Sequence, residues 1–252
     1  MIDKNMHAAS EDEILRSRLQ RPGGDHYRAY VGPPDEFDFM GATQFALAIA
    51  LGLREEHRLL DVGCGSLRAG RLMLQYLLPG RYFGIEPNER LWREIVAKEI
   101  GNDLLTLKQP RFSANAEFDF ACFGASFDMI IAQSIFSHAG SDLFERAVAS
   151  AAGVLAPDGQ FLFTVLSEGT PGFGQLGDGA QSEGWFYPQC VTFRESDVAA
   201  ICARSGLLLQ KLPWFHPRQR WYRAVRSPDR MLADPQTAFR DGRILFDPRF
   251  ST

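Results

Sequence analysis

The sequence of 252 residues has few cysteines and no long apolar segment. Its four cysteines, which are Cys64, Cys122, Cys190 and Cys202, are widely spaced and form no Cys-x-x-Cys pair. This spacing predicts neither a disulfide framework nor a zinc site, so we expect no bound metal. No apolar run approaches membrane-spanning length, and the opening residues 1–4 start no apolar signal segment. We therefore expect a cytoplasmic protein without a membrane partner.

The sequence also lacks an excess of positive charge. Its 27 lysine and arginine residues are outnumbered by 31 acidic residues, which leaves a net charge of −4 and a pI near 5.8. A nucleic-acid-binding protein usually carries a basic footprint, so we expect no nucleic-acid partner. The hydrophobic content of 45% is ordinary for a globular protein, and the length suits one α/β domain with additions.

The most informative stretch is residues 59–70, which predict a strand, a glycine turn and a helix in succession. Leu59, Leu60 and Val62 supply the apolar strand. Gly63 and Gly65 allow a tight turn and leave room for a ligand that a Cβ atom would block. A helix that opens near Arg68 would direct its unpaired N–H groups toward that ligand.

A second strand is predicted at residues 82–86, and it ends in the carboxylate of Glu86. An acidic residue at the end of the second strand can accept hydrogen bonds from both hydroxyls of a ribose. The two motifs together predict a ligand that contains a nucleoside. The dinucleotide fingerprint GxGxxG would require a third glycine where Arg68 stands, which disfavours an NAD-dependent oxidoreductase.

Strands and helices alternate through most of the chain, which predicts an α/β fold whose parallel sheet has helices on both faces. Asp142 and Glu145 have the spacing of a capping box for one of these helices. The predicted strands are 59–62, 82–86, one within 111–116, 127–132, 160–166, 207–212 and 221–225. The predicted helices are 39–53, 68–78, 89–100, 142–155 and 195–205. We divide the chain into an N-terminal helical or lid segment (1–54), a core domain (55–226) and an irregular extension (227–252).

These motifs resemble those of the class I S-adenosylmethionine-dependent methyltransferases. Asp61, Gly63 and Gly65 match the family's first motif, although Leu67 stands where its third glycine is expected. Residues 133–138 after the fourth strand and the turn at 155–161 also resemble the family. The resemblance covers residues 55–226 and is nearest to uncharacterised bacterial small-molecule methyltransferases. It implies a Rossmann-like, seven-stranded, mostly parallel sheet whose last strand is antiparallel.

The resemblance also implies which residues bind the cofactor, S-adenosylmethionine, and its product, S-adenosylhomocysteine. Asp61 would lie under the amino-acid end and Glu86 at the ribose. Asp119 and Phe120 are the candidates for binding the adenine. Asn115 is an alternative candidate at that position, and Phe120 is equally compatible with a place in the core. The complete predicted cofactor set is Asp61, Gly63, Cys64, Gly65, Glu86, Pro87, Asp119, Phe120, Gln133 and Ser134.

The methyl acceptor is expected beside residues that can remove a proton or build an apolar wall. His138 is the candidate general base; as an alternative, it only binds backbone near a helix start. His26 and His216 are weaker candidates. Tyr27, Tyr30, Trp185 and Tyr187, with His138, are the predicted substrate-binding residues.

We therefore expect an enzyme that transfers a methyl group from S-adenosylmethionine to a small-molecule acceptor, at oxygen. Two alternatives stay open: a protein methyltransferase, and a non-catalytic protein that binds S-adenosylmethionine or another nucleoside on the same fold. The sequence identifies neither the acceptor nor the oligomeric state.

Overall fold

The computed structural model describes residues 12, 16, 20–170, 182–187 and 189–240. Residues 1–11, 13–15, 17–19, 171–181, 188 and 241–252 lie outside this range. Our division of the chain into three segments remains a prediction.

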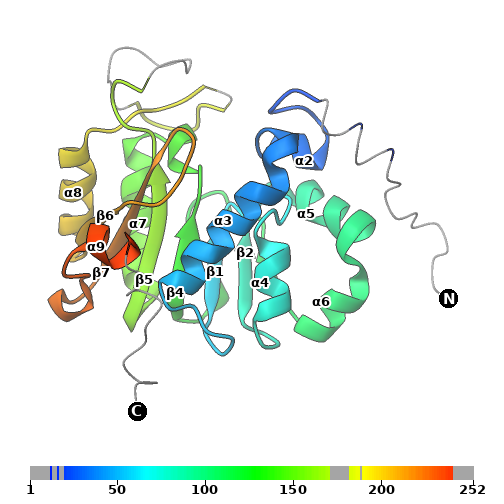
Figure 1. Cartoon of the computed structure of the whole chain (residues 1–252), viewed down its shortest axis with the longest axis horizontal. Helices are drawn as coiled ribbons and strands as arrows, with labels where there is room; N and C mark the ends of the chain where they lie inside the picture. Colours follow the sequence, from blue (N-terminus) through cyan, green and yellow to red (C-terminus); the bar gives the residue numbers. More distant parts are fainter. Residues whose placement is uncertain (1–11, 13–15, 17–19, 171–181, 188, 241–252) are drawn as a thin grey trace.

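A seven-stranded sheet forms the centre of the fold, with the strand order β3-β2-β1-β4-β5-β7-β6 (Figure 1). Strands β1 to β5 pair in parallel, and β7 runs antiparallel to both of its neighbours, β5 and β6. The strands are β1 (Leu59–Val62), β2 (Tyr82–Ile85), β3 (Arg111–Ser113), β4 (Phe127–Ala132), β5 (Leu155–Val165), β6 (Leu208–Leu212) and β7 (Arg220–Val225). This confirms the predicted fold class.

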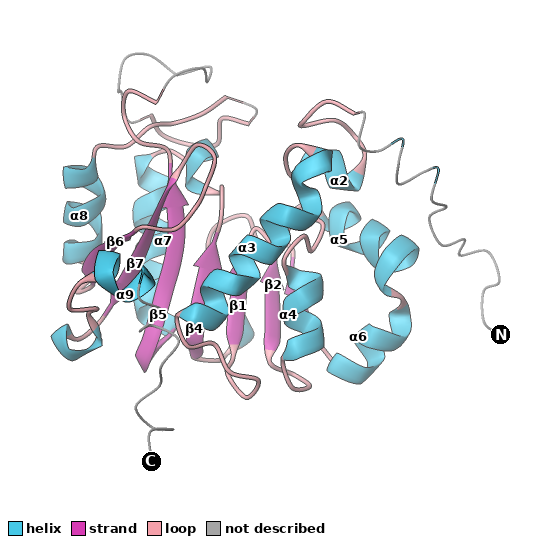
Figure 2. Ribbon diagram, in the orientation of Figure 1, coloured by secondary structure: helices cyan, strands magenta, loops and turns pink. Residues whose placement is uncertain are grey.

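Helices cover both faces of the sheet (Figure 2). Helices α3, α4 and α5 pack with apolar residues such as Leu59 and Ile131, while α7 and α8 pack with those on the other face, such as Leu60 and Ile130. The helices are α2 (Tyr27–Tyr30), α3 (Phe37–Ala50), α4 (Gly70–Tyr76), α5 (Glu89–Ile95), α6 (Asn102–Lys108), α7 (Ser141–Val154), α8 (Glu195–Arg204) and α9 (Pro235–Arg240). Shorter turns are η1 (Pro34–Glu36), the π-helical η2 (Val96–Ile100), η3 (Phe120–Phe123), η4 (Phe136–His138) and η5 (Pro228–Arg230).

The first helix after the glycine turn starts later than predicted. Helix α4 begins at Gly70 and not near Arg68, and its N-cap is Ala69. Leu67 has a φ of 52°, in the left-handed region, so the chain is not helical at that residue. Strand β5 starts earlier than predicted, at Leu155, and its pairing with β4 is irregular between Phe127 and Met129. These shifts leave the order of the elements unchanged.

The predicted capping box of α7 is wrong. The N-cap of this helix is Gly140, and Asp142 instead accepts a hydrogen bond from the N–H of Gly184. Glu145 pairs with Arg204 of α8. Both side chains therefore bind neighbouring segments rather than the first turn of their own helix.

The described part of the C-terminal extension folds back on the sheet. Buried Arg223 of β7 donates to the carbonyl of Arg230, 2.6 Å away, and Gln210 of β6 donates to that of Leu232. Helix α9, which was predicted as irregular chain, follows this contact. Among the described residues, no helix has the length and apolar composition of a membrane-spanning segment.

Candidate functional site

The turn after β1 is closed by hydrogen bonds to β2. The N–H groups of Gly63 and Cys64 both donate to the carbonyl of Ile85, at 2.8 and 3.0 Å. Gly63 and Gly65 have φ values of 67° and 52°, which favour glycine. A Cβ on Gly63 would lie 2.0 Å from Cδ1 of Ile135, and one on Gly65 would lie 2.7 Å from Cγ1 of Val31. The side chains of Ile135 and Val31 therefore fill part of the space beside these glycines that we expected a ligand to use.

Glu86 connects the turns that follow β1 and β2. Its Oε2 accepts the N–H of Gly65 at 3.0 Å, and its Oε1 accepts the N–H of Asn88 at 2.8 Å. Burial raises the pKa of this carboxyl group, against the effect of the two N–H donors. Because each carboxylate oxygen has two lone-pair sites, each can accept one further hydrogen bond. Glu86 can therefore hold a pair of ligand hydroxyls at the carboxyl end of β2.

Asp61 is buried beneath the glycine turn and binds a side chain rather than the turn. Tyr82 donates its hydroxyl proton to Oδ2 of Asp61 at 2.7 Å. Burial raises the pKa of Asp61 to about 6, although Tyr82 and the nearby cation of Arg68 lower it. Arg68 itself donates from Nη1 to the carbonyl of Val31 at 2.7 Å. Asp61 and Arg68 thus place opposite charges directly under the turn.

Several buried polar atoms around this turn have no hydrogen-bond partner among the described residues. Gln133, which is 8% exposed directly after β4, leaves both its amide oxygen and its amide nitrogen unpaired. Ser66 Oγ and Arg68 Nε are also unpaired. Buried polar groups are nearly always hydrogen-bonded in native proteins. These atoms therefore fit a polar ligand that supplies both donors and acceptors.

The remaining predicted cofactor residues differ in their surroundings. Asp119 is exposed and caps η3 by accepting the N–H of Ala121. Phe120 is fully buried in the core, and its N–H donates to Ser150 Oγ. Cys64 is also buried, and burial raises the pKa of its thiol. Pro87 is exposed beside Glu86. Of these four, Asp119 and Pro87 are open to a ligand through their side chains.

Three of the predicted acceptor residues come together from distant parts of the chain. The ring of Tyr187 stacks on that of Tyr30 with their centroids 5.4 Å apart. It also meets the ring of His138 edge-on at 5.3 Å. Trp185 lies on Phe118, with ring centroids 5.3 Å apart, and bridges to Ala139 through the backbone. The N-terminal segment and residues 182–187 therefore meet beside the carboxyl end of β4.

The backbone determines which nitrogen of His138 carries the proton. Nδ1 lies 2.8 Å from the carbonyl oxygen of Gln189, and a carbonyl can only accept. Nδ1 is therefore protonated, and in the neutral ring Nε2 has a free lone pair. Burial lowers the pKa of His138, and Arg218 lowers it further, against the carbonyl of Gln189. His138 consequently has the tautomer and charge state that a general base requires.

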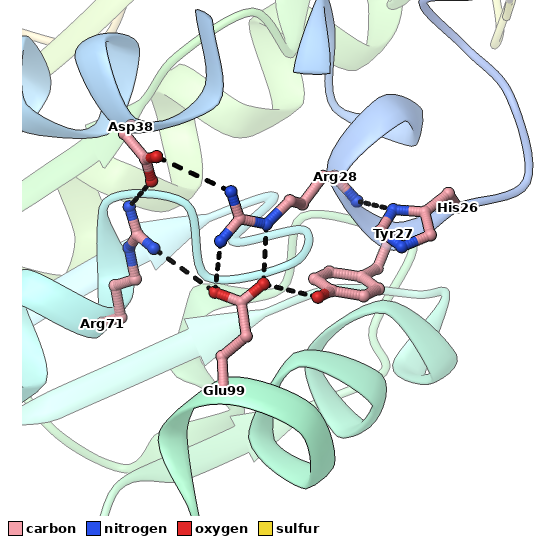
Figure 3. A network of polar contacts seen from close by, with 6 residues as sticks. All are labelled: His26, Tyr27, Arg28, Asp38, Arg71 and Glu99. Carbon is pink, nitrogen blue, oxygen red and sulfur yellow. Dashed lines mark hydrogen bonds and ion pairs between the residues drawn. The ribbon is translucent and has the colours of Figure 1, made fainter. Parts of the chain in front are cut away.

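Tyr27 belongs to a buried polar network and not to an open surface (Figure 3). Its hydroxyl donates to Glu99 of η2, and Glu99 also receives two 2.6 Å hydrogen bonds from Arg28. Arg71 of α4 pairs with Glu99 and with Asp38 of α3. This network fastens α2 and α3 to the core and holds Tyr30 and Val31 next to the glycine turn.

A second polar network, at the ends of β4, β5 and β7, contains residues that the sequence did not single out. Thr164 and Gln219 are buried, and both contact the segment that starts at Ser134. His216, a weak candidate from the sequence, joins them through Ser134 Oγ. The only signal in the sequence was Thr164, a polar residue inside an apolar strand.

The comparisons with known proteins support one family. The family model of a methyltransferase domain matches residues 60–161. No curated protein matches the chain by sequence. Solved structures with the same fold include magnesium protoporphyrin IX methyltransferase from Synechocystis PCC 6803, with bound S-adenosylmethionine, at a TM-score of 0.57 and 14% identity over 87% of this chain and 92% of that one.

Two further similar structures are bacterial methyltransferases. One is an S-adenosylmethionine-dependent methyltransferase from Clostridium acetobutylicum, with a TM-score of 0.57, 14% identity, and coverage of 75% of this chain and 92% of that one. The other is 1,6-didemethyltoxoflavin-N1-methyltransferase from Burkholderia thailandensis, with a TM-score of 0.53, 19% identity, and coverage of 73% and 76%.

The strand order and the antiparallel β7 are those of the class I methyltransferase fold. Residues 60–161 match the model of a methyltransferase domain, and they lie within this class I methyltransferase fold.

Proposed function

We propose that this protein transfers a methyl group from S-adenosylmethionine to a small-molecule acceptor at oxygen, with the cofactor at the carboxyl ends of β1, β2 and β4. One observation carries the proposal. Gln133, buried at the end of β4, has no partner for either amide atom, and Glu86 directs a carboxylate with spare lone pairs toward the same end of the sheet. The buried atoms of Ser66 and Arg68 add to this unmet hydrogen-bonding capacity.

The cofactor-binding residues have distinct roles in this proposal. Glu86 accepts the two ribose hydroxyls, and Asp119 accepts the exocyclic amine of the adenine. Gln133 and Ser134 line the amino-acid end, and Asp61 supplies negative charge beneath it. When bound, S-adenosylmethionine supplies an activated methyl group on a sulfonium. Because they are enclosed in the core, the side chains of Phe120 and Tyr27 are left out of the proposed site.

The acceptor is proposed to lie beside the rings of Tyr30, Tyr187 and Trp185, next to His138. His138 takes the proton from an acceptor hydroxyl through Nε2, while the carbonyl of Gln189 keeps the ring oriented. The aromatic rings exclude water and align the nucleophile, which is the main requirement of an in-line methyl transfer. An acceptor that is already ionised, such as a carboxylate, would not need the base.

A small-molecule acceptor is also favoured by the similar structures. The acceptors named for two of them, magnesium protoporphyrin IX and 1,6-didemethyltoxoflavin, are both small molecules. The second is methylated at nitrogen, so the choice of oxygen rests on His138 and its surroundings in this chain.

The experiment that tests this function uses S-adenosylmethionine with an isotopically labelled methyl group. The purified protein is incubated with it and with either the low-mass or the protein fraction of a bacterial extract. We expect label in the low-mass fraction, and release of methanol from a labelled ester in alkali would identify a carboxylate oxygen. Label found only in protein would contradict the proposal. Cofactor binding without any transfer to either fraction would favour the non-catalytic alternative.

A further inference from the structure

The hydrogen bonds around Ser134 have a fixed direction, which begins at Thr164. Oγ1 of Thr164 accepts the N–H of Ser134 at 2.8 Å, and its own proton goes to Oε1 of Gln219 at 2.6 Å. This bond makes the carbonyl oxygen of the Gln219 side chain face Thr164. The amide nitrogen of Gln219 must therefore face the other way.

On that other side, Gln219 donates to two serines. Its Nε2 lies 3.1 Å from Ser134 Oγ and 3.3 Å from Ser137 Oγ. The hydroxyl of Ser137 donates in turn to the main-chain carbonyl of Ser134 at 3.2 Å. One lone pair of Ser134 Oγ is thus occupied by Gln219.

His216 occupies the second lone pair. Its Nδ1 accepts the N–H groups of Arg218 and Gln219, at 3.2 and 3.0 Å, and so carries no proton. Nε2 must then carry it, and Nε2 lies 3.2 Å from Ser134 Oγ. Burial, with Arg68 and Arg218 nearby, lowers the pKa of His216 to about 3, so the ring stays neutral at ordinary pH. His216 is therefore a fixed donor and unsuited to act as a base.

A serine hydroxyl has two acceptor lone pairs and one proton to donate. With both lone pairs of Ser134 Oγ filled by N–H donors, its proton can only be given to a further acceptor. No described residue takes it. Ser134 also has a φ of 62°, a strained conformation for a residue other than glycine, of the kind that concentrates at functional sites. Its neighbour Gln133 is buried with both amide atoms unpaired.

We propose that the Ser134 hydroxyl is a one-directional donor to a ligand carboxylate that binds at the end of β4. The location rests on the function proposed above, but the direction of the hydrogen bond rests on the network alone. A carboxylate oxygen is the matching partner because it only accepts. The cations of Arg68 and Arg218, whose charges reach His216, favour an anion at this place. The carboxylate has two possible sources: the cofactor's amino-acid end and the methyl acceptor.

The direction of the network is tested first, and without any ligand. Nitrogen-15 NMR of the histidine side chains should show His216 neutral and protonated at Nε2 from pH 5 to pH 8. A proton on Nδ1, or a charged ring in this range, would overturn the proposal. This result does not depend on whether the protein is a methyltransferase.

The partner is tested by calorimetry with Ser134→Ala and with Ser134→Gly, which also lacks the hydroxyl and relieves the backbone strain. S-adenosylhomocysteine is compared with 5′-methylthioadenosine, which has no carboxylate. Benzoate is compared with benzamide, both with and without S-adenosylhomocysteine. Ser137→Ala is the matched control, because it alters the same network but leaves the Ser134 hydroxyl in place.

If the cofactor supplies the carboxylate, both Ser134 variants should bind S-adenosylhomocysteine at least about tenfold more weakly and 5′-methylthioadenosine unchanged, as expected for the loss of a hydrogen bond to a charged group. If the acceptor supplies it, benzoate should lose affinity and benzamide should not. This inference would be overturned if the Ser134 variants bound S-adenosylhomocysteine as tightly as wild type does, and benzoate as tightly as wild type does. The methyltransferase function would still stand. Failure of wild type to bind S-adenosylhomocysteine would instead contradict the proposed function, while the benzoate arm and the NMR result would still test the Ser134 donor.

Discussion

Glu86 and Gly65 are joined by a 3.0 Å hydrogen bond between the turns that follow β2 and β1. The carboxylate that is proposed to hold the ribose therefore also shapes the glycine turn beside it. This arrangement couples the two halves of the proposed cofactor site through a single side chain. A change at Glu86 should affect both ligand affinity and the local backbone.

Glu86→Gln tests this coupling. The substituted amide keeps only one acceptor oxygen, so one backbone N–H and one ribose hydroxyl lose their partner. We expect the affinity for S-adenosylhomocysteine to fall by about 1–3 kcal/mol in a calorimetric titration, the range for unpaired polar groups. Glu89→Gln, a change three residues away in an exposed i,i+4 pair with Arg93, should leave it unchanged. Unchanged affinity in the Glu86 variant, with an intact fold, would remove Glu86 from the proposed site.

Asp61 should make stability depend on pH in an unusual direction. The folded protein holds this proton up to about pH 6, whereas the unfolded chain releases it near the ordinary aspartate pKa of 3.8. Between these values the unfolded state binds fewer protons, so the contribution of Asp61 to the free energy of unfolding falls as the pH rises. Asp61→Asn removes this dependence and should be stabilised relative to wild type above pH 6, by on the order of 2 kcal/mol.

Urea unfolding at several pH values between 4 and 7 measures this difference, because other titrating groups cancel between the two proteins. Tyr82→Phe provides a second check, since it removes the only hydroxyl that binds Asp61 among the described residues. A pH-independent difference between wild type and Asp61→Asn would show that this carboxylate is already ionised in the acidic range.

Protonation of His138 should determine the acidic limb of the dependence of kcat on pH. Because burial and Arg218 lower its pKa below the usual value of 6.5, the ring becomes an active base at a lower pH than an exposed histidine would. We expect the midpoint of the acidic limb of kcat with a hydroxyl acceptor to lie below pH 6.5. His138→Gln should lower kcat by about 10²–10⁴-fold and abolish this limb, as the loss of a general base does. His216→Gln should keep the limb, and a profile that follows His216 would contradict the assignment of the base.

The Arg28–Glu99 network should be a main determinant of how firmly the N-terminal segment is attached. Arg28 is 4% exposed, and its removal would leave the partly buried carboxylate of Glu99 with weaker partners. Arg28→Ala is expected to cost about 3 kcal/mol in the free energy of unfolding, as when one partner of a buried ion pair is removed. Arg204→Ala, which breaks an exposed pair with Glu145, should cost less than about 1 kcal/mol. Similar losses in both variants would contradict this account.

The sequence predicted the central strands well because their signals are local. The apolar runs of β1 and β4 and the glycine turn at Gly63 and Gly65 are all visible within a few residues. The order of elements and the family resemblance then led to the correct sheet. Glu86 was proposed as the ribose-binding residue in the same way, from its position directly after a strand, and that role remains a prediction.

The features that the sequence missed depend on contacts between distant segments. Asp142 has the spacing of a capping residue, but its partner is Gly184, 42 positions away. Tyr27 was predicted to bind the substrate, yet it is buried against Glu99, 72 positions away. Gln219 meets Ser134 across 85 positions. No pattern along the chain encodes such pairs, so the polar networks became visible only in the folded structure.

The central claim is that the chain binds S-adenosylmethionine at the ends of β1, β2 and β4. Calorimetric titration with S-adenosylmethionine and S-adenosylhomocysteine, with NAD as the control, tests it most directly. We predict binding of the first two in the micromolar range, about −8 kcal/mol, and none of NAD. Binding of NAD alone, or of none of the three, would contradict the account.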